Sequence, residues 1–389
     1  MTRFQPDRRE LLAGAFATGA LTLGGTSLAH ARTANDRKLV VVILRGAMDG
    51  LAALIPAAEP RYRDLRQDLA ISGGFDVGEG FRLHPRLTNL HRFWNDRELV
   101  LLPATATGYR ERSHFDGQDY LEAGSQVIRD GWLNRALQVS ANRPTSVGIG
   151  QTVPLILRGD AATTSWSPGI LPDPSDGTIE RLMDLYAGDS RLAETLAMAV
   201  ETDAIADGML MNDMGTGGGG PGQAYLQTAR AAANLLAAPD GPGLAVISLD
   251  GWDTHVRQGS DDGQLANRLG ALDAALAILR DGLQAQWSDT AVLVLTEFGR
   301  TVRANGSGGT DHGTAGTAFL LGGAVRGGRL IGDWPGLDTL HEDRDLVPAN
   351  RTENLCRTVL AEHWGLDRRA LDQRVFPGLG SSGFRGLIG

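Results

Sequence analysis

The stretch "LAVISLDGWDTH" (residues 244–255) decides the fold, because it joins a buried strand to a group of polar side chains. The run from 244 to 249 is apolar except for one serine and shows no polar/apolar alternation, which is typical of a strand buried on both faces. Asp250, Asp253 and His255 follow where this strand ends. Because ligands of open α/β sheets bind at the carboxyl ends of strands, we expect a functional site here.

Similar apolar runs recur along the chain and are separated by helical patterns. The further strands are expected at 39–44, 98–103, 153–157, 291–296 and 317–325. The clearest helix covers 262–286, where leucines recur at steps of three and four residues. The other helices are expected at 85–94, 115–123, 178–186, 191–206, 224–237 and 351–364. This alternation predicts an α/β fold with a mostly parallel central sheet and helices on both faces.

The first 31 residues have the features of an export signal. An Arg8-Arg9 pair precedes an uncharged, moderately apolar run from Leu11 to Ala29, and a small-x-small ending closes at Ala31. This pattern favours the twin-arginine translocase, and the glycine-interrupted run is too weakly apolar for a stable membrane span. We therefore expect a periplasmic or secreted bacterial protein. Residues 32–389 would form one α/β domain, with a helix-rich cap or insertion at about 160–240.

The charge balance excludes some functions. The chain carries a formal net charge of −9. Neutralising phosphates requires a basic face, so this balance argues against a nucleic-acid partner while leaving room for a local basic pocket. The single cysteine, Cys356, excludes an internal disulfide, and stability must come from a sizeable core.

Acidic and imidazole side chains adjoin several expected strands. Taken alone, an aspartate after a strand is more often a turn former or helix cap, and a lone histidine is more often structural. Their joint placement at one sheet edge favours a metal site, and imidazole with carboxylate suits zinc, manganese or iron. The residues concerned are Asp49, Asp250, Asp253, His255, Glu297, Asp311 and His312.

A further polar stretch, "RERSHFDGQDYLEAG" (110–124), precedes and enters an expected helix. Backbone N–H groups and the helix dipole at such an N-terminus favour an anion. Ser113 either caps this helix or acts as a metal-activated hydroxyl nucleophile, and both interpretations stay open.

A family resemblance rests on six features of the chain. These are the twin-arginine leader and the motifs "VVVILRGAMDGL", "RSHFDGQDYLEAG", "SLDGWDTH", "LTEFGRT" and "GTDHG". Together they resemble the bacterial exported family known as domain of unknown function 1501. That family is placed with the alkaline phosphatase and sulfatase superfamily. The resemblance implies an alkaline phosphatase-like fold that hydrolyses phosphate or sulfate esters at a site with one or two divalent metal ions.

The resemblance also implies roles for individual residues. Asp49 looks like the first metal aspartate and Ser113 like the nucleophile, while Arg112 or Arg300 would hold the oxygens of the ester. The other metal positions fall on Asp250 or Asp253, His255, Glu297 and His312, with Asp311 either a ligand or a hydrogen-bond partner of one. Phe298 stands where the superfamily usually has a histidine, which leaves open whether the site holds one metal ion or two.

Two functions follow from these expectations. The first is an exported metal-dependent hydrolase, holding zinc or manganese and acting on a small anionic ester. The second is a noncatalytic exported metal-binding or assembly protein whose site has degenerated.

Overall fold

The computed structural model describes residues 37–150, 152–167, 176–186, 188–210, 221–380 and 383–389, and the expected leader lies outside this part of the chain. A nine-stranded sheet forms its centre, with strand order β11-β5-β10-β9-β1-β8-β6-β7 and β12 beside β5. The strands are β1 (Lys38–Arg45), β5 (Leu99–Ala106), β6 (Ser146–Ile149), β7 (Thr164–Trp166), β8 (Leu244–Asp250), β9 (Thr290–Thr296), β10 (Gly316–Leu321), β11 (Arg329–Leu330) and β12 (Asn350–Arg351). A small sheet joins β2 (Leu54–Ile55), β4 (Arg82–Leu83) and β3 (Phe75–Asp76).

The central sheet is mostly parallel. β1 pairs in parallel with both β8 and β9, and β6 pairs in parallel with β8 and β7. β10 is the exception, because it runs antiparallel to both of its neighbours, β5 and β9. The residues that precede β10 therefore lie at the same edge as the residues that follow β1, β8 and β9.

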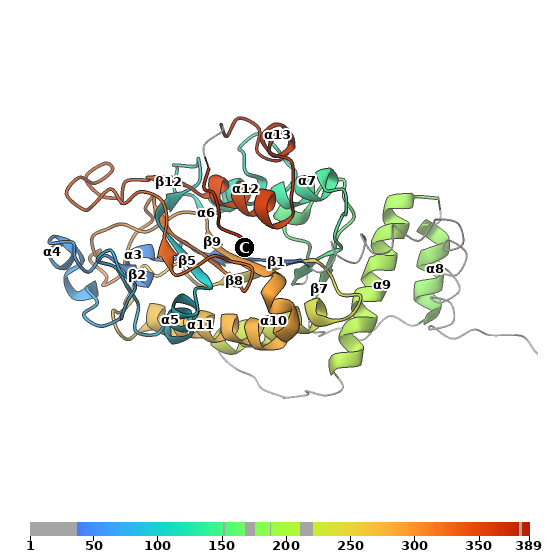
Figure 1. Ribbon diagram of the computed structural model, residues 1–389, viewed down its shortest axis with the longest axis horizontal. Helices are drawn as coiled ribbons and strands as arrows, with labels where there is room; N and C mark the ends of the chain where they lie inside the picture. The colour runs from blue at the N-terminus through green and yellow to red at the C-terminus, as the bar shows by residue number, and fades with distance from the viewer. Residues whose placement is uncertain (1–36, 151, 168–175, 187, 211–220, 381–382) are drawn as a thin grey trace, which may run out of the picture.

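Helices cover both faces of the sheet, as Figure 1 shows. One face packs against α3 (Gly50–Ala53), α5 (Thr88–Asn95), α10 (Pro221–Ala237) and α11 (Gln264–Leu283). The other packs against α6 (His114–Ala123), α7 (Trp132–Val139), α12 (Thr352–His363) and a π-helical turn at Leu371–Val375. Short helices complete the described part: α4 (Tyr62–Arg66), α13 (Arg368–Ala370) and 3-10 turns at Gln67–Leu69, Leu155–Leu157 and Gln284–Asp289.

The central strand shows why its sequence lacks alternation. Val40 and Val42 of β1 belong to one hydrophobic core, and Val41 and Ile43 belong to the core on the opposite face. All four side chains are at most 1% exposed. Burying an aliphatic side chain of this size contributes about 1.5–3 kcal/mol, so both faces hold the strand in place.

The helix-rich segment at 160–240 divides into two parts. α10 packs against α11 and β8 as part of a helical layer of the sheet. In contrast, α8 (Asp176–Tyr186) and α9 (Ser190–Leu210) stand beside the sheet at the right of Figure 1, where α9 contacts β7.

The observed elements confirm the expected α/β class, with two differences in detail. The strand expected at 153–157 is wrong, because Leu155–Leu157 forms a 3-10 turn. Pro154 begins this segment and has no N–H to donate to a neighbouring strand. Several elements lie outside the expected ranges, among them β6, an inner strand, and α7, a covering helix.

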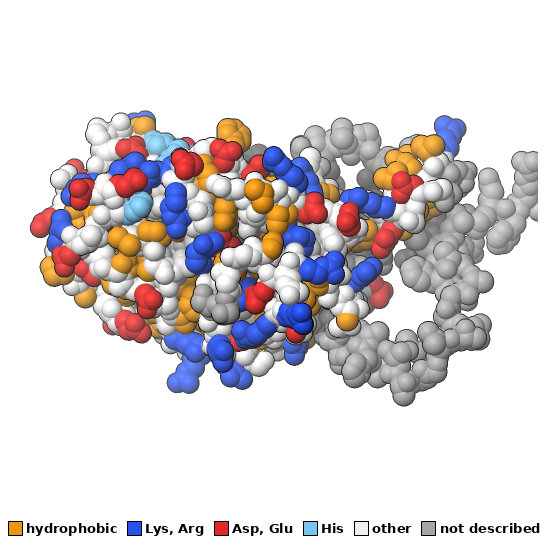
Figure 2. All heavy atoms as spheres, turned by 90° about the horizontal axis from the view of Figure 1, so that it is seen from above, with side chains coloured by type: hydrophobic (Ala, Val, Ile, Leu, Met, Phe, Trp, Pro, Cys, Tyr) orange, Lys and Arg blue, Asp and Glu red, His pale blue; other side chains and the backbone are white. Residues whose placement is uncertain are grey.

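In the described residues, no helix combines the length and the apolar character that crossing a membrane requires. On the face seen in Figure 2, basic and acidic side chains are mixed over the upper part, and several basic side chains gather along the lower edge.

Candidate metal centre

The topology brings four segments to one edge of the sheet. Gly46 follows β1, Asp253 and His255 follow β8, and Glu297 follows β9. His312 precedes β10 and reaches the same edge because β10 is antiparallel to β9. A fifth segment, the beginning of α6, contributes His114 to the same region.

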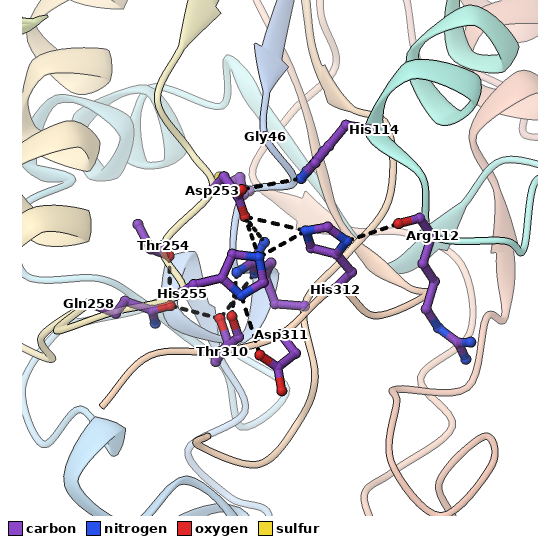
Figure 3. A network of polar contacts seen from close by, with 12 residues as sticks. Gly46, Arg112, His114, Asp253, Thr254, His255, Gln258, Thr310, Asp311 and His312 are labelled. Carbon is purple, nitrogen blue, oxygen red and sulfur yellow. Dashed lines mark hydrogen bonds and ion pairs between the residues drawn. The ribbon is translucent and has the colours of Figure 1, made fainter. Parts of the chain in front are cut away.

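Three imidazoles converge on one carboxylate in what we call the His/Asp cluster: His114, Asp253, His255 and His312 (Figure 3). Asp253 Oδ1 lies 3.0 Å from His255 Nε2 and 3.4 Å from His312 Nε2, and its Oδ2 lies 3.5 Å from His114 Nε2. The Nε2 atoms of His255 and His312 are 2.9 Å apart.

Each histidine has an oxygen partner on its other ring nitrogen. His114 Nδ1 lies 2.8 Å from Glu297 Oε1, and His255 Nδ1 lies 3.3 Å from Asp311 Oδ1. His312 Nδ1 lies 2.9 Å from the carbonyl oxygen of Arg112. Each of these oxygens can accept a hydrogen bond from an Nδ1–H group, and in that tautomer Nε2 carries the lone pair that a metal ion would bind. This orientation is the usual one for metal-ligating histidines.

The cluster fits a single divalent cation. Zinc lies about 2.0–2.1 Å from its nitrogen and oxygen ligands, which places tetrahedral ligand atoms about 3.3 Å apart. Four separations between atoms of the cluster run from 2.9 to 3.5 Å. Within the cluster, His114, Asp253 and His312 offer ligand atoms that all lie within 4.8 Å of one another, and His255 adjoins two of them. His114 Nε2 is shielded from solvent and has no hydrogen-bond partner. Two facing lone pairs at 2.9 Å repel unless a cation or proton lies between them.

Burial and charge tune the groups around the cluster. The hydrogen bond from His114 to Glu297 raises the pKa of His114 against the opposing effect of burial. Burial and the nearby His114 lower the pKa of His312. Burial works to raise the pKa of Asp253, but the hydrogen bond and charge of Arg300 outweigh it, and this pKa is lowered. The lowered pKa values favour the ionised Asp253 and the neutral His312 that metal binding requires, whereas the raised pKa of His114 means that a metal ion there must displace a proton.

Two arginines predicted to hold an ester are already engaged. The buried Arg300 donates from Nη1 to Asp253 Oδ1 at 2.6 Å and from Nε to the Thr310 hydroxyl at 3.1 Å, and its Nη2 binds the Thr310 carbonyl. Arg112 donates from Nε to Asp345 at 2.9 Å and from Nη2 to Glu342 at 2.5 Å. Arg300 therefore holds Asp253 in place, and Arg112 bridges Asp345 and Glu342.

Asp49 lies outside the cluster in a buried ion pair. Its Oδ2 accepts from Arg66 Nη2 and, at 2.7 Å, from Gln258 Nε2, while its Oδ1 accepts from the backbone N–H of Leu51 at 3.2 Å and caps α3. Both Asp49 and Arg66 are at most 1% exposed.

The remaining predicted residues lie around the cluster. The side chain of Asp250 is exposed, and its backbone carbonyl accepts a hydrogen bond from Tyr225. The chain thus places Asp253, not Asp250, beside His255. Asp311 contacts the cluster through His255 Nδ1. The Ser113 hydroxyl accepts from Asp116 N–H at 3.5 Å and caps α6.

Glu297 contacts the cluster through His114. It is fully buried, and its Oε1 accepts from Gly46 N–H at 2.8 Å and from Gln118 at 3.2 Å in addition to His114. Gly46 has φ +115°, and a Cβ there would lie 2.6 Å from Asp253 N. Only glycine lets the end of β1 approach the Asp253 loop so closely.

Sequence reasoning missed His114 as a possible ligand. It lies directly after Ser113 in the motif that was interpreted as an anion site at a helix N-terminus. The sequence did contain a signal for this ligand, because His114 is a third histidine beside acidic residues and lies at the start of an expected helix. The His114 ring stacks on Phe298, with ring centroids 5.0 Å apart. Phe298 occupies the position at which the superfamily usually has a histidine, and here it packs against the histidine of another segment.

A cavity of about 890 Å³ lies beside the cluster and not within it. Arg45 and Glu122, an ion pair at 2.7 Å, line it together with Tyr109, Asp119 and Arg158. Arg45 also donates to Gln118, which donates to Glu297. Hydrogen bonds therefore join the cavity wall to the support of His114.

A family comparison covers most of the chain. The family model described as "Protein of unknown function (DUF1501)" matches residues 103–375. No curated protein matches the sequence.

Solved structures show only distant likeness. Murine ectonucleotide pyrophosphatase/phosphodiesterase 5 in complex with AMP has 10% identity and a TM-score of 0.32, covering 68% of this chain and 57% of that chain. A phosphonate monoester hydrolase of Agrobacterium radiobacter has 11% identity and a TM-score of 0.36, covering 76% and 70%. A sulfatase from Pseudoalteromonas sp. has 11% identity and a TM-score of 0.33, covering 79% and 68%. Values this low carry no argument about activity.

Proposed function

Because the chain belongs to the family described as protein of unknown function DUF1501, a description that assigns no chemistry, we propose its function from the site itself. We propose that the protein is an exported metal-dependent hydrolase of phosphate or sulfate esters. Its divalent cation, zinc or manganese, would be held by the His/Asp cluster.

One observation carries this proposal. All three histidines turn Nε2 toward Asp253, and an oxygen lies within 3.3 Å of Nδ1 in each ring. A structural histidine needs no such convergence. Nitrogen and carboxylate ligands together suit zinc or manganese better than calcium or magnesium, which prefer oxygen alone.

The residues define the chemistry that the site would support. A bound divalent cation would supply Lewis-acid polarisation of an ester oxygen and would lower the pKa of a water molecule or hydroxyl beside it. Arg300 holds Asp253 in its ionised form. The side chains of Asp253 and His255 are 40% and 38% exposed, so a small anionic ester can approach from solvent.

A second function is favoured by a different observation. Arg112 and Arg300 both have their guanidinium groups committed to other partners, and the Ser113 hydroxyl caps a helix. These contacts leave the groups expected to bind and attack the ester with structural roles. They favour a noncatalytic exported metal-binding or assembly protein with a degenerate site.

Turnover by the reconstituted protein tests the two functions. Metal-depleted protein would be reloaded with Zn²⁺ or Mn²⁺ and assayed on chromogenic phosphate and sulfate monoesters, with His312→Ala as the disabled variant and His91→Ala as its matched control. Metal-restored turnover that His312→Ala alone loses supports the hydrolase. Tight metal binding without turnover on either ester favours the second function.

Ser113→Ala then tests the nucleophile on whichever ester is accepted. Loss of turnover with metal binding intact supports the Ser113 hydroxyl as nucleophile. An undiminished rate removes that role and leaves water as the attacking group.

Export remains a separate proposal, because the leader lies outside the described residues. Replacing the arginine pair, Arg8→Lys with Arg9→Lys, should block export through the twin-arginine translocase. Fractionation of cells that express both versions measures this, and unchanged export of the variant would contradict it.

A further inference from the structure

Asp49 stands where the family resemblance implies a metal aspartate, but its surroundings differ from those of a ligand. Both carboxylate oxygens accept hydrogen bonds from side-chain or backbone donors within the protein. Among the metal-ligating side chains of the described residues, the convergent group contains His114, Asp253 and His312 and does not contain Asp49. A cation at Asp49 would have to displace donors that are already in place.

Arg66 supplies the positive charge that Asp49 requires. The guanidinium binds Asp49 Oδ2 through Nη2, and its Nη1 donates to the carbonyls of Thr301 and Val302 at 3.4 and 3.3 Å. The Arg66 side chain is 0% exposed and that of Asp49 is 2% exposed. A buried carboxylate needs a close positive partner, and here a side chain of the same chain provides it.

A chain of buried hydrogen bonds runs from this ion pair to the His/Asp cluster. Gln258 donates from Nε2 to Asp49 at 2.7 Å, and its Oε1 accepts from the Thr310 hydroxyl at 2.8 Å. Thr310 Oγ1 in turn accepts from Arg300 Nε at 3.1 Å, and Arg300 Nη1 donates to Asp253 at 2.6 Å. Three side chains, Gln258, Thr310 and Arg300, therefore connect Asp49 to Asp253 by hydrogen bonds.

We infer that the centre holds one cation, that Arg66 takes the place of a second, and that Asp49 is a positioning residue acting on Asp253 through Gln258, Thr310 and Arg300. The inference rests on the proposed metal centre. It sets the number of metal ions at one, where the family resemblance allowed one or two. It also gives Asp49 a structural role that involves no contact with the metal.

Metal stoichiometry of the wild-type protein tests the first part without any variant. Protein saturated with Zn²⁺ and freed of excess metal should contain one ion per chain. Two ions per chain, one of which is lost in Asp49→Asn, would overturn the inference while leaving the metal centre itself standing. The absence of any bound ion would overturn the proposed function together with the inference.

Two isosteric threonine variants test the positioning role. Thr254 and Thr310 are both buried and both donate to Gln258 Oε1, at 2.7 and 2.8 Å, but of their hydroxyls only that of Thr310 bonds to Arg300. Thr310→Val should weaken Co²⁺ binding by about 10- to 100-fold and change the visible spectrum of the Co²⁺-loaded protein. Thr254→Val should change both much less.

The spectrum separates positioning from general destabilisation, because it reports on the ligand geometry of the protein that has folded and bound. Circular dichroism would confirm that both variants are folded. If Thr310→Val and Thr254→Val have the same affinity and the same spectrum, the chain from Asp49 does not position Asp253, and that part of the inference is overturned.

Discussion

His255 and His312 face each other through their Nε2 atoms at 2.9 Å, and in each ring Nδ1 lies beside an oxygen, at 3.3 Å in His255 and 2.9 Å in His312. Two lone pairs held so closely repel each other unless a cation or a proton lies between them. The fold imposes this arrangement from two directions, because His255 follows β8 and His312 precedes the antiparallel β10. The contact is the local reason to expect a cation here.

Glu297 should support metal binding without being a ligand. Glu297→Gln keeps the size of the side chain but weakens the acceptor for His114 Nδ1. Replacing such a partner typically costs 10- to 100-fold in metal affinity, and we expect a loss of about that size. Calorimetric titration with Zn²⁺ measures it. Glu342→Gln, at an exposed partner of Arg112, is the matched control, and equal affinities for the two variants would refute this role.

Gly46→Ala should disturb both stability and the cluster. The new Cβ would lie 2.6 Å from Asp253 N, and φ of +115° strains any other residue. Strain and overpacking together should cost about 2–4 kcal/mol of unfolding free energy and weaken Zn²⁺ binding. Urea denaturation and metal titration check both effects. Gly306→Ala, where a Cβ meets nothing within 4 Å, should leave both nearly unchanged, and similar behaviour of the two variants would contradict the packing argument.

His363 should make stability depend on pH. Burial lowers its pKa from 6.5 to about 4, against the raising effect of its hydrogen bond to the Lys38 carbonyl. Below pH 6.5 the unfolded chain therefore binds a proton that the folded chain refuses, and stability falls as the pH falls toward 4. The loss between about pH 7 and pH 5 should be about 2 kcal/mol from this group.

His363→Gln should remove that part of the pH dependence while keeping a donor for Lys38. Urea denaturation at both pH values measures the difference. His91→Gln is the control, because His91 is only half-buried. A wild-type pH dependence that survives unchanged in His363→Gln would show that the buried imidazole does not cause it.

The main strands were predictable from sequence because burial on both faces leaves a simple pattern. β1, β8 and β9 appear as continuous apolar runs, and polar residues begin where each strand ends. β6 escaped because it has only four residues, "SVGI", and includes a glycine. The false strand at 153–157 shows the opposite error, since composition alone does not reveal that Pro154 starts a 3-10 turn.

The site was only partly predictable, because its decisive contacts join residues distant in sequence. The placement of Asp253, His255 and His312 at strand ends or entries indicated where they would lie. The ion pair between Arg66 and Asp49 could not be predicted, because nothing in the sequence distinguishes Arg66 from the other charged residues of its short helix. The commitment of Arg112 to Asp345 spans more than 200 residues, and only the folded chain shows it.

The metal content of His114→Ala is the sharpest test of whether the His/Asp cluster binds a divalent cation. Wild-type protein, His114→Ala and His91→Ala would be loaded with Zn²⁺, dialysed and analysed by elemental mass spectrometry. We predict one ion per chain in the wild type and in His91→Ala, and loss of most of it in His114→Ala. Equal metal content in all three proteins would contradict it.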